Sequence, residues 1–282
     1  MTKRANSRSA PERGYFRGRT VLVTGASSGI GRDVALTMAR MGARTALLAR
    51  RARVIDQLAQ EIRAGGGEAL ALSADVTERA CVFDAIRRVL ARFGRIDIVV
   101  NSAGLLHAGP IEKLDPSELE RMMAVNLYGT LHTIHAVLPA MRRAGEGTIV
   151  NIGSLAGRRG VPPLGGYAAT KFALVGLTEA LRVELFGSGI RVALVMPGVV
   201  DTPMTRAAIG SEHFGGIPAA MRSLPVQWVT WAVLAAIALG LNEVDVPPGA
   251  AIAEKVAALF PALTDTLLAL GGRFADWMTG RH

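Results

Sequence analysis

The chain has 282 residues, enough to bury a full hydrophobic core, and half of them are hydrophobic while only 5% are aromatic. With 32 glycines, this composition excludes a disordered chain and favours an α/β protein with tight turns between buried parallel strands. The formal net charge is +9, and the single cysteine, Cys81, excludes an intrachain disulfide and favours a reducing, cytoplasmic location.

Residues 1–17 are predicted to form a flexible basic tail. Six basic residues stand against one acidic residue between Met1 and Arg19, so this segment carries five of the nine net charges. Such a polar, charged segment is usually solvated and mobile, and we therefore expect no nucleic-acid partner. No apolar run follows the basic residues, so a secretory signal is not expected either.

From Thr20 to Val246, strand-like and helix-like segments alternate. The predicted strands are Thr20–Thr24, Thr45–Ala49, Glu68–Ser73, Ile96–Asn101, Gly147–Ile152, Arg191–Met196 and Glu243–Val246. The predicted helices are Gly29–Met41, Ala52–Ala64, Thr77–Phe93, Asp115–Arg143 and Tyr167–Phe186. Repeated strand-then-helix order predicts a doubly wound, seven-stranded parallel sheet with helices on both faces, formed as one domain by residues 18–248.

Residues 249–282 are predicted to form a helical extension, with helices at Ala251–Leu259 and Ala262–Leu270 separated by Pro261. The preceding apolar run, Trp228–Leu241, has fourteen residues, fewer than the roughly 20 that cross a bilayer. We expect this run to be a core or subunit-interface helix. A role for this apolar region as a substrate lid, or in peripheral contact with a membrane surface, is the alternative.

A glycine-rich turn follows the first strand and leads into the first helix. Its residues are Gly25, Ser27, Ser28, Gly29, Ile30 and Gly31. Glycines are required where a pyrophosphate must approach backbone N–H groups closely, and the positive end of the helix dipole favours the same anion. Three glycines alone would indicate only a tight turn, but between a strand and a helix they predict a Rossmann-like dinucleotide site.

The end of the second strand predicts which dinucleotide binds. Enzymes that use NAD commonly place an acidic residue here to bind the ribose hydroxyls, whereas an arginine suits a 2′-phosphate. This chain has Arg50 and Arg51 and no acid at that point. We therefore expect NADP(H) rather than NAD(H), with an ordinary solvated helix start as the alternative.

Residues after the third and fourth strands are expected to complete the nucleotide site. Asp75 and Val76 follow the third strand and would hold the adenine edge. Asn101, Ala103 and Gly104 follow the fourth strand, where the glycine allows another close approach to the cofactor.

Catalytic residues are predicted on the second half of the chain. Tyr167 and Lys171 are four residues apart and so share one helical face. We expect the Lys171 ammonium to lower the pKa of the phenol toward working pH. Ser154 would orient a substrate oxygen, and the buried amide of Asn126 would hold a water that leads toward Lys171. A Tyr/Lys pair alone would be a surface pair, but its co-occurrence with the glycine turn predicts a catalytic set.

In these motifs the chain resembles the short-chain dehydrogenase/reductase family, from about Thr20 to about Pro248. The resemblance implies that Tyr167 donates and accepts the proton and that Lys171 lowers its pKa and binds the nicotinamide ribose. It implies that Ser154 polarises the substrate carbonyl and that Asn126 anchors a proton-relay water.

The segment after the sixth strand matches the family stretch that contacts nicotinamide. Its implied contact residues are Pro197, Gly198, Val200 and Thr202, with Thr202 on the carboxamide. Ser102 stands where the family commonly has a second asparagine. This departure from the family pattern weakens no part of the predicted catalytic set. The next segment resembles a substrate lid, and its apolar residues are Met204, Ile209, Phe214, Met221 and Leu224. They suggest a lipophilic carbonyl or alcohol substrate, such as a steroid, a retinoid or a fatty acyl derivative.

The sequence thus predicts an NADP(H)-dependent alcohol/ketone oxidoreductase, in which the family resemblance implies a homodimer or homotetramer through the helices at Asp115–Arg143 and Tyr167–Phe186. The alternatives are a non-catalytic nucleotide-sensing module and an NAD-dependent dehydrogenase of a small alcohol. His132 and His135 lie three apart, but without a third ligand we expect no metal site. For His107, substrate contact and simple loop exposure remain equally open.

Overall fold

The structure is a computed structural model that describes residues 14–209 and 223–279. Its centre is a seven-stranded sheet in the order β3-β2-β1-β4-β5-β6-β7, in which every pair of neighbours is parallel. The strands are β1 (Thr20–Thr24), β2 (Arg44–Ala49), β3 (Glu68–Ser73), β4 (Ile98–Asn101), β5 (Gly147–Ile152), β6 (Ile190–Pro197) and β7 (Glu243–Val246). The predicted doubly wound sheet is therefore confirmed.

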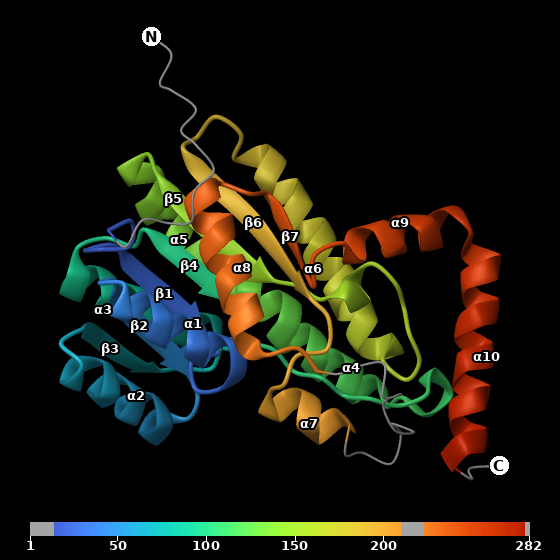
Figure 1. The fold of residues 1–282 in the computed structure, drawn as a ribbon. Coiled ribbons are helices and arrows are strands. Elements are labelled where there is room, and N and C mark those ends of the chain that lie inside the picture. The colour runs from blue at the N-terminus through green and yellow to red at the C-terminus, as the bar shows by residue number, and fades with distance from the viewer. Residues whose placement is uncertain (1–13, 210–222, 280–282) are drawn as a thin grey trace.

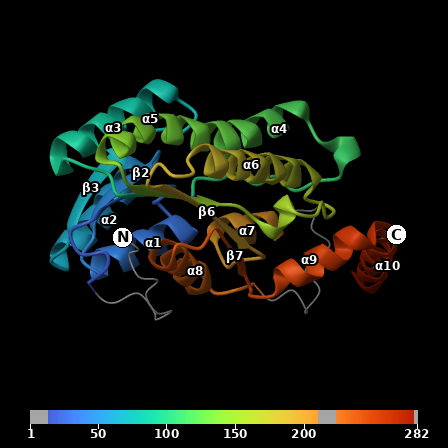
Figure 2. The same ribbon diagram turned by 90° about the horizontal axis from the view of Figure 1, so that it is seen from above.

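Helices cover both faces of the sheet, as Figures 1 and 2 show. One face carries α1 (Gly29–Arg40), α2 (Ala52–Ala64) and α8 (Val226–Leu239). The other face carries α3 (Arg79–Phe93), α5 (Gly129–Ala144) and α6 (Gly165–Glu184). The shorter helices α4 (Pro116–Met123) and α7 (Pro203–Ile209) lie near the carboxyl ends of the strands.

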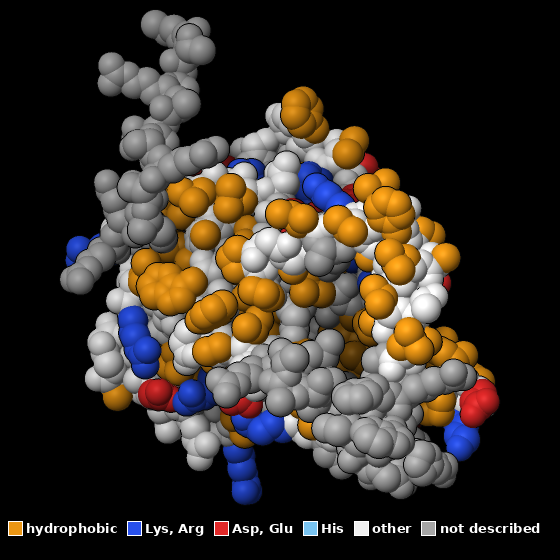
Figure 3. All heavy atoms as spheres, turned by 45° about the vertical axis from the view of Figure 1, so that its right-hand side comes forward, with side chains coloured by type: hydrophobic (Ala, Val, Ile, Leu, Met, Phe, Trp, Pro, Cys, Tyr) orange, Lys and Arg blue, Asp and Glu red, His pale blue; other side chains and the backbone are white. Residues whose placement is uncertain are grey.

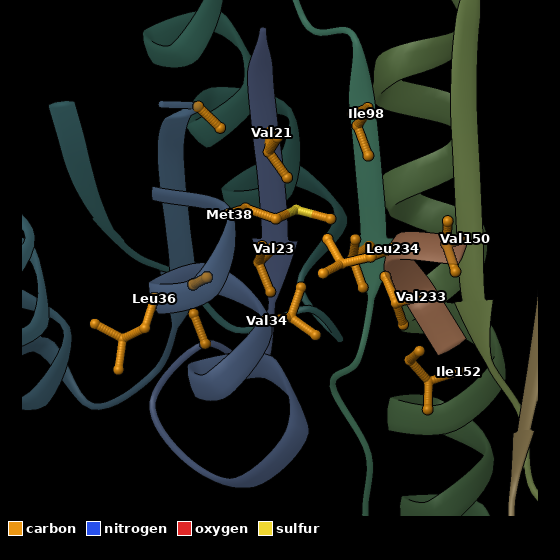
Figure 4. Packing of buried hydrophobic residues seen from close by; sticks show 14 of the residues in the cluster. Val21, Val23, Val34, Leu36, Met38, Ile98, Val150, Ile152, Val233 and Leu234 are labelled. Atoms are coloured by element: carbon orange, nitrogen blue, oxygen red, sulfur yellow. The ribbon is translucent and has the colours of Figure 1, made fainter. Parts of the chain in front are cut away.

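The central strands β1, β4 and β5 are buried on both sides, which explains their largely apolar sequences, whereas the edge strands β3 and β7 are only partly buried. In Figure 4, Val21 and Val23 of β1 lie close to Val34 and Met38 of α1. Val233 of α8 belongs to the same buried cluster, and α8 is accordingly a core helix, as its apolar run predicted. Within the described residues, none of the helices combines the length and the hydropathy required of a membrane span.

The long helix predicted for Asp115–Arg143 is interrupted. Asp115 is the N-cap, accepting a hydrogen bond from the Ser117 N–H (2.9 Å), and Pro116 opens α4 as predicted. A π-helical turn at Ala124–Tyr128 then separates α4 from α5. The sequence gives no sign of this turn because none of its residues breaks a helix. Such turns are frequent at functional sites.

Most other element boundaries shift by one or two residues, but the last helix, predicted to end at Leu270, continues to Thr279. Helix α3 begins at Arg79 rather than Thr77, because the Asp75 carboxylate accepts hydrogen bonds from both the backbone and the hydroxyl of Thr77 and holds a turn there. Strand β4 begins at Ile98 rather than Ile96. Helix α6 begins at Gly165, which places Tyr167 within its first turn.

The extension forms α9 (Ala250–Leu259) and α10 (Pro261–Thr279), which meet at Phe260 and Pro261. In Figure 1, these helices stand at the side of the molecule away from β3 and α2. Strand order reverses between β1 and β4, so a crevice is expected at their carboxyl ends.

Candidate active site

A cavity of about 1600 Å³ lies at the carboxyl ends of the strands. Cavities that hold one drug-sized ligand measure roughly 300–1000 Å³, so this one has room for a dinucleotide and a second molecule. The predicted site residues that line it are Gly25, Ser27, Ser28, Gly29, Ile30, Arg50, Arg51, Asp75, Val76, Ala103, Gly104, Ser154, Tyr167, Lys171, Pro197, Gly198, Val200 and Thr202. The fold thus gathers residues from seven separate segments around one space.

Three predicted residues do not line the cavity. A Cβ on Gly31 would lie 2.5 Å from the Gly25 carbonyl oxygen, so Gly31 allows α1 to pack closely against the turn. Asn101 is buried and donates a hydrogen bond to the side chain of Asn151 (2.9 Å), its partner on the neighbouring strand β5. Asn126 is buried beneath the cavity wall.

The glycine turn has the geometry of a phosphate cradle. Gly25 and Gly29 have positive φ (68° and 54°), and a Cβ on Gly25 would lie 2.8 Å from the Ala103 backbone. Ser28 is the N-cap of α1, but its side chain makes no capping hydrogen bond, and the first turn of α1 holds no acidic residue. The backbone N–H groups and the helix dipole therefore suit an anion.

Two arginines lie beside this turn. The Arg51 guanidinium donates to the hydroxyls of Ser27 (2.8 Å) and Ser28 (2.9 Å), which draws it across the mouth of the glycine turn. Arg50 pairs with Asp75 at 3.5 Å, and its side chain is 70% exposed. The end of the cavity beside the glycine turn thus presents positive charge.

Tyr167 and Lys171 face the cavity from one side of α6. The Lys171 ammonium donates to the Ile152 carbonyl at 2.9 Å and lies 5.7 Å from the centre of the Tyr167 ring. Both side chains are buried. Burial raises the pKa of Tyr167 to about 12, opposed by a hydrogen bond with Ser154, and burial lowers the pKa of Lys171 to about 8.

This direction differs from the expected lowering of the Tyr167 pKa by Lys171. In the protein alone, loss of hydration disfavours the phenolate more than the neighbouring groups favour it. The Lys171 ammonium is directed to a main-chain carbonyl of β5. A buried, protonated phenol is the form that can donate a proton at neutral pH.

Ser154 is placed by the carboxyl end of β5. It is the N-cap of a short 3₁₀ helix at Leu155–Gly157, and its hydroxyl accepts a hydrogen bond from the Ala156 N–H (3.2 Å). The same side chain is hydrogen-bonded to Tyr167. The turn therefore holds the Ser154 and Tyr167 oxygens together at one point of the cavity.

Asn126 lies in the π-helical turn and uses its side chain differently from the prediction. Its amide oxygen accepts from the Leu105 N–H (2.7 Å), and its amide nitrogen donates to the Leu105 carbonyl (2.9 Å) and the Thr170 hydroxyl (2.9 Å). Both side-chain donor hydrogens are therefore committed within the protein. The side chain joins the loop after β4 to α6, three residues from Tyr167 and one from Lys171, and a role in holding water stays a prediction.

The segment after β6 closes the cavity. The Thr202 hydroxyl accepts from the Thr205 N–H (3.2 Å) at the start of α7, and a Cβ on Gly29 would lie 3.2 Å from the Thr202 side chain. Of the predicted lid residues, Met204, Ile209 and Leu224 line the cavity. The other two, Phe214 and Met221, lie outside the described residues.

The predicted histidines are placed elsewhere. His107 does not line the cavity and lies 3.9 Å from Glu118. A ring nitrogen of His132 lies 3.0 Å from the Val76 carbonyl, a contact that tethers α5 to the turn after β3.

Two groups of lining residues were missed. One is the loop Arg159–Leu164 between β5 and α6, and the other comes from the extension, namely Ala250, Ala257, Thr264, Asp265, Leu267, Leu268 and Ala269. Their sequences carry no motif, and only the apolar character of the C-terminal region suggested a role as a substrate lid.

A doubly wound sheet with a phosphate cradle at its switch point and a buried Tyr/Lys/Ser set in the same cavity defines a dinucleotide-dependent oxidoreductase. Residues 19–212 match the family described as short chain dehydrogenase. The chain therefore belongs to the short-chain dehydrogenase family, which confirms the resemblance seen in the sequence. It is an oxidoreductase that acts on CH–OH groups with a nicotinamide cofactor.

Individual relatives are similar over most of their length. A sorbitol dehydrogenase of Cereibacter sphaeroides is 38% identical over 203 residues, which cover 72% of this chain and 75% of the relative. The oxidoreductase UcpA of Escherichia coli is 40% identical over 195 residues, covering 69% of this chain and 74% of the relative.

Two solved structures of dehydrogenases or reductases align with this chain over most of their length. A 3-ketoacyl-(acyl-carrier-protein) reductase from Brucella melitensis, complexed with NADH, aligns with a TM-score of 0.75 and 31% identity over 83% of this chain and 99% of its own. A candidate NAD(P)-dependent gluconate 5-dehydrogenase from Beutenbergia cavernae, with bound NADP, has the same TM-score and identity over 83% of this chain and 97% of its own.

Proposed function

We propose that the protein interconverts an apolar alcohol and the corresponding ketone or aldehyde, with NADP(H) as its cofactor. The observation that carries this proposal is that Tyr167, Lys171 and Ser154 line the same cavity as the glycine turn and Arg51. The nicotinamide, when bound, would supply or accept the hydride.

Tyr167 would move the proton that accompanies the hydride. In reduction, its hydroxyl donates a proton to the substrate oxygen as the C–O bond order falls, and in oxidation the phenolate takes that proton back. Ser154 would donate a hydrogen bond to the same oxygen and hold it against Tyr167 while negative charge develops. The Lys171 ammonium, buried in the same wall, would favour the negative charge left on Tyr167.

The charge at the adenosine end supports NADP(H). Arg51 lies across the glycine turn and Arg50 lies at the exposed rim, whereas the end of β2 has no acid to bind ribose hydroxyls. A guanidinium can bind a phosphate through two parallel hydrogen bonds, which gives both charge and geometry for the 2′-phosphate.

The other end of the cavity supports an apolar substrate. Apart from the residues assigned to the cofactor, the lining includes the apolar side chains Leu106, Leu155, Val161, Leu164, Met204, Ile209 and Leu224. The polar side chains Arg159, Thr205, Thr264 and Asp265 also line the cavity, but apolar side chains outnumber them. Burial of each CH₂ group of a ligand against such a surface contributes about 0.8 kcal/mol.

A homo-oligomer formed through α4, α5 and α6 is part of the proposal. Three large apolar side chains of or just after α6 are exposed, namely Phe172 (45%), Val183 (75%) and Phe186 (93%). Light scattering would test it, and a monomer at micromolar concentration would exclude it.

The catalytic proposal is tested by NADPH consumption, followed by absorbance, with a panel of ketones. Tyr167→Phe removes the hydroxyl that moves the proton and should lower kcat by at least about 100-fold. Tyr128→Phe is the matched control, because Tyr128 is half exposed and does not line the cavity. Equal rates for Tyr167→Phe and the parent, or faster turnover of sugars than of apolar ketones, would contradict the proposal.

A further inference from the structure

The C-terminal extension forms one wall of the cavity that contains Tyr167. Among its described side chains up to Leu270, only four are half-buried, and these are Ala250, Ala257, Thr264 and Leu268. All four line the cavity. The spacing of seven residues between Ala250 and Ala257 in α9, and of four between Thr264 and Leu268 in α10, places each pair on one face of its own helix, and both faces are turned toward the site.

The remaining surface of the extension is apolar but exposed, and Figure 3 shows how densely apolar side chains cover this side of the molecule. Leu263 and Leu270, for example, are 59% and 56% exposed and do not line the cavity. Leu267 is 61% exposed and does line it, so it lies at the rim. On α10 the inward stripe therefore consists of the half-buried Thr264 and Leu268, while the exposed Asp265, Leu267 and Ala269 line the cavity at its rim.

An ion pair fastens this wall to the catalytic loop. Arg159, from the loop that joins Ser154 to Tyr167, donates a hydrogen bond to the Asp265 carboxylate of α10. The Asp265 side chain is 71% exposed. An exposed ion pair contributes little free energy, and salt screens it. The two partners line the cavity, and Val161 and Leu164 of the same loop face it as well.

We infer that α10 is the substrate-selecting wall of the enzyme: the apolar tail of the substrate lies between the loop at Val161–Leu164 and the Leu267–Leu268 part of α10, with Arg159 and Asp265 setting the position of the wall. This inference rests on the proposed function and adds the residues that recognise the substrate. The occupant is the substrate tail, because the half-buried residues of the extension line the same cavity as Tyr167.

The proposed selection of substrates by α10 is tested by measuring the reduction of methyl ketones, from butanone to 2-dodecanone, with NADPH. The ratio of kcat/KM for 2-dodecanone to kcat/KM for butanone should fall about tenfold in Leu268→Ser, because the tail loses an apolar contact. Leu263→Ser is the matched control, since it makes the same change on the same helix outside the cavity. Equal ratios in parent, Leu268→Ser and Leu263→Ser would overturn the inference.

The positioning role of the ion pair is tested by reversing its charges. Arg159→Asp and Asp265→Arg should each raise KM for 2-dodecanone by several-fold. The double variant remakes the ion pair with opposite polarity and should therefore bring KM most of the way back to the parent value. A loss through misfolding would not be rescued by the second change. Failure of the double variant to recover, with both single variants impaired and folded, would exclude the positioning role.

Failure of the proposed function has a different signature. If the parent reduces none of the ketones, the function is wrong, and the wall is then judged by binding of the neutral apolar dye N-phenyl-1-naphthylamine to the protein with NADP⁺. Weaker dye binding by Leu268→Ser than by Leu263→Ser would support an apolar wall. Equal binding by the two variants and the parent would overturn it.

Discussion

Lys171 lies one helical turn after Tyr167 on α6, and its ammonium nitrogen lies 5.7 Å from the centre of the Tyr167 ring. The same ammonium group donates a hydrogen bond to the carbonyl of Ile152. The strand β5 thus holds the ammonium while α6 holds the phenol. Since burial lowers the pKa of Lys171 to about 8 and raises that of Tyr167 to about 12, both groups are destabilised in their charged forms.

The buried ammonium should make stability depend on pH. Below pH 8, Lys171 is protonated in both folded and unfolded chains, and the folded chain bears the full cost of burying its charge. Between pH 8 and about 10, the unfolded chain binds more protons, so the free energy of unfolding rises with pH.

Lys171→Met removes this contribution. Without added nucleotide, the rise in the free energy of unfolding from pH 7 to pH 10 should be smaller in Lys171→Met than in the parent by up to about 3 kcal/mol. Urea denaturation at several pH values measures it. The range ends at pH 10 because ionisation of Tyr167 has the opposite sign above that pH. Superimposable pH profiles would contradict the prediction.

Removal of Arg51 should change the choice of cofactor. In Arg51→Ala, the ratio of NADPH affinity to NADH affinity should fall about 10- to 100-fold, because a phosphate loses charge-assisted hydrogen bonds. Fluorescence titration with each nucleotide measures this. Arg53→Ala is the control, since Arg53 is exposed and does not line the cavity. A parent that binds both nucleotides equally would rule out the preference.

Replacing glycine by alanine at two helical positions should change the stability of the protein in opposite directions. Gly31→Ala places a Cβ 2.5 Å from the Gly25 carbonyl oxygen and should destabilise the protein by about 1–3 kcal/mol while weakening nucleotide binding. Gly176→Ala, on an exposed position of α6 with no atom within 4 Å, should stabilise by about 0.5–1 kcal/mol. Thermal unfolding distinguishes them, and shifts of the same sign would refute the argument.

Asn126→Ala should lower stability and activity together. The Leu105 N–H and carbonyl would both lose their partner in a part-buried site, which should cost about 2–4 kcal/mol. The loop after β4 would then no longer be tied to α6, and kcat should fall. Ser154→Ala provides the contrast, with a similar loss of kcat but little loss of stability. An Asn126→Ala variant as stable as the parent would show that its bonds to Leu105 are not structural.

The sheet could be predicted because the central strands are short apolar runs that helix periodicity does not fit, and because strand-like and helix-like segments alternate along the chain. The catalytic set could be predicted because the spacing of Tyr167 and Lys171 and the glycine turn reflect local geometry. The use of the Asn126 side chain could not, since its partners Leu105 and Thr170 are distant in sequence. The same limit applies to the Arg159–Asp265 pair, whose members are 106 residues apart and carry no pattern.

The last strand of the sheet ends at Val246, and α9 and α10 come after every residue of the catalytic set. The proposed substrate-selecting helix α10 therefore follows the catalytic residues in the chain, although the loop at Val161–Leu164 that faces it lies among them. A protein built in this order can acquire a new substrate through changes near its end, while the side chains that move the proton stay as they are.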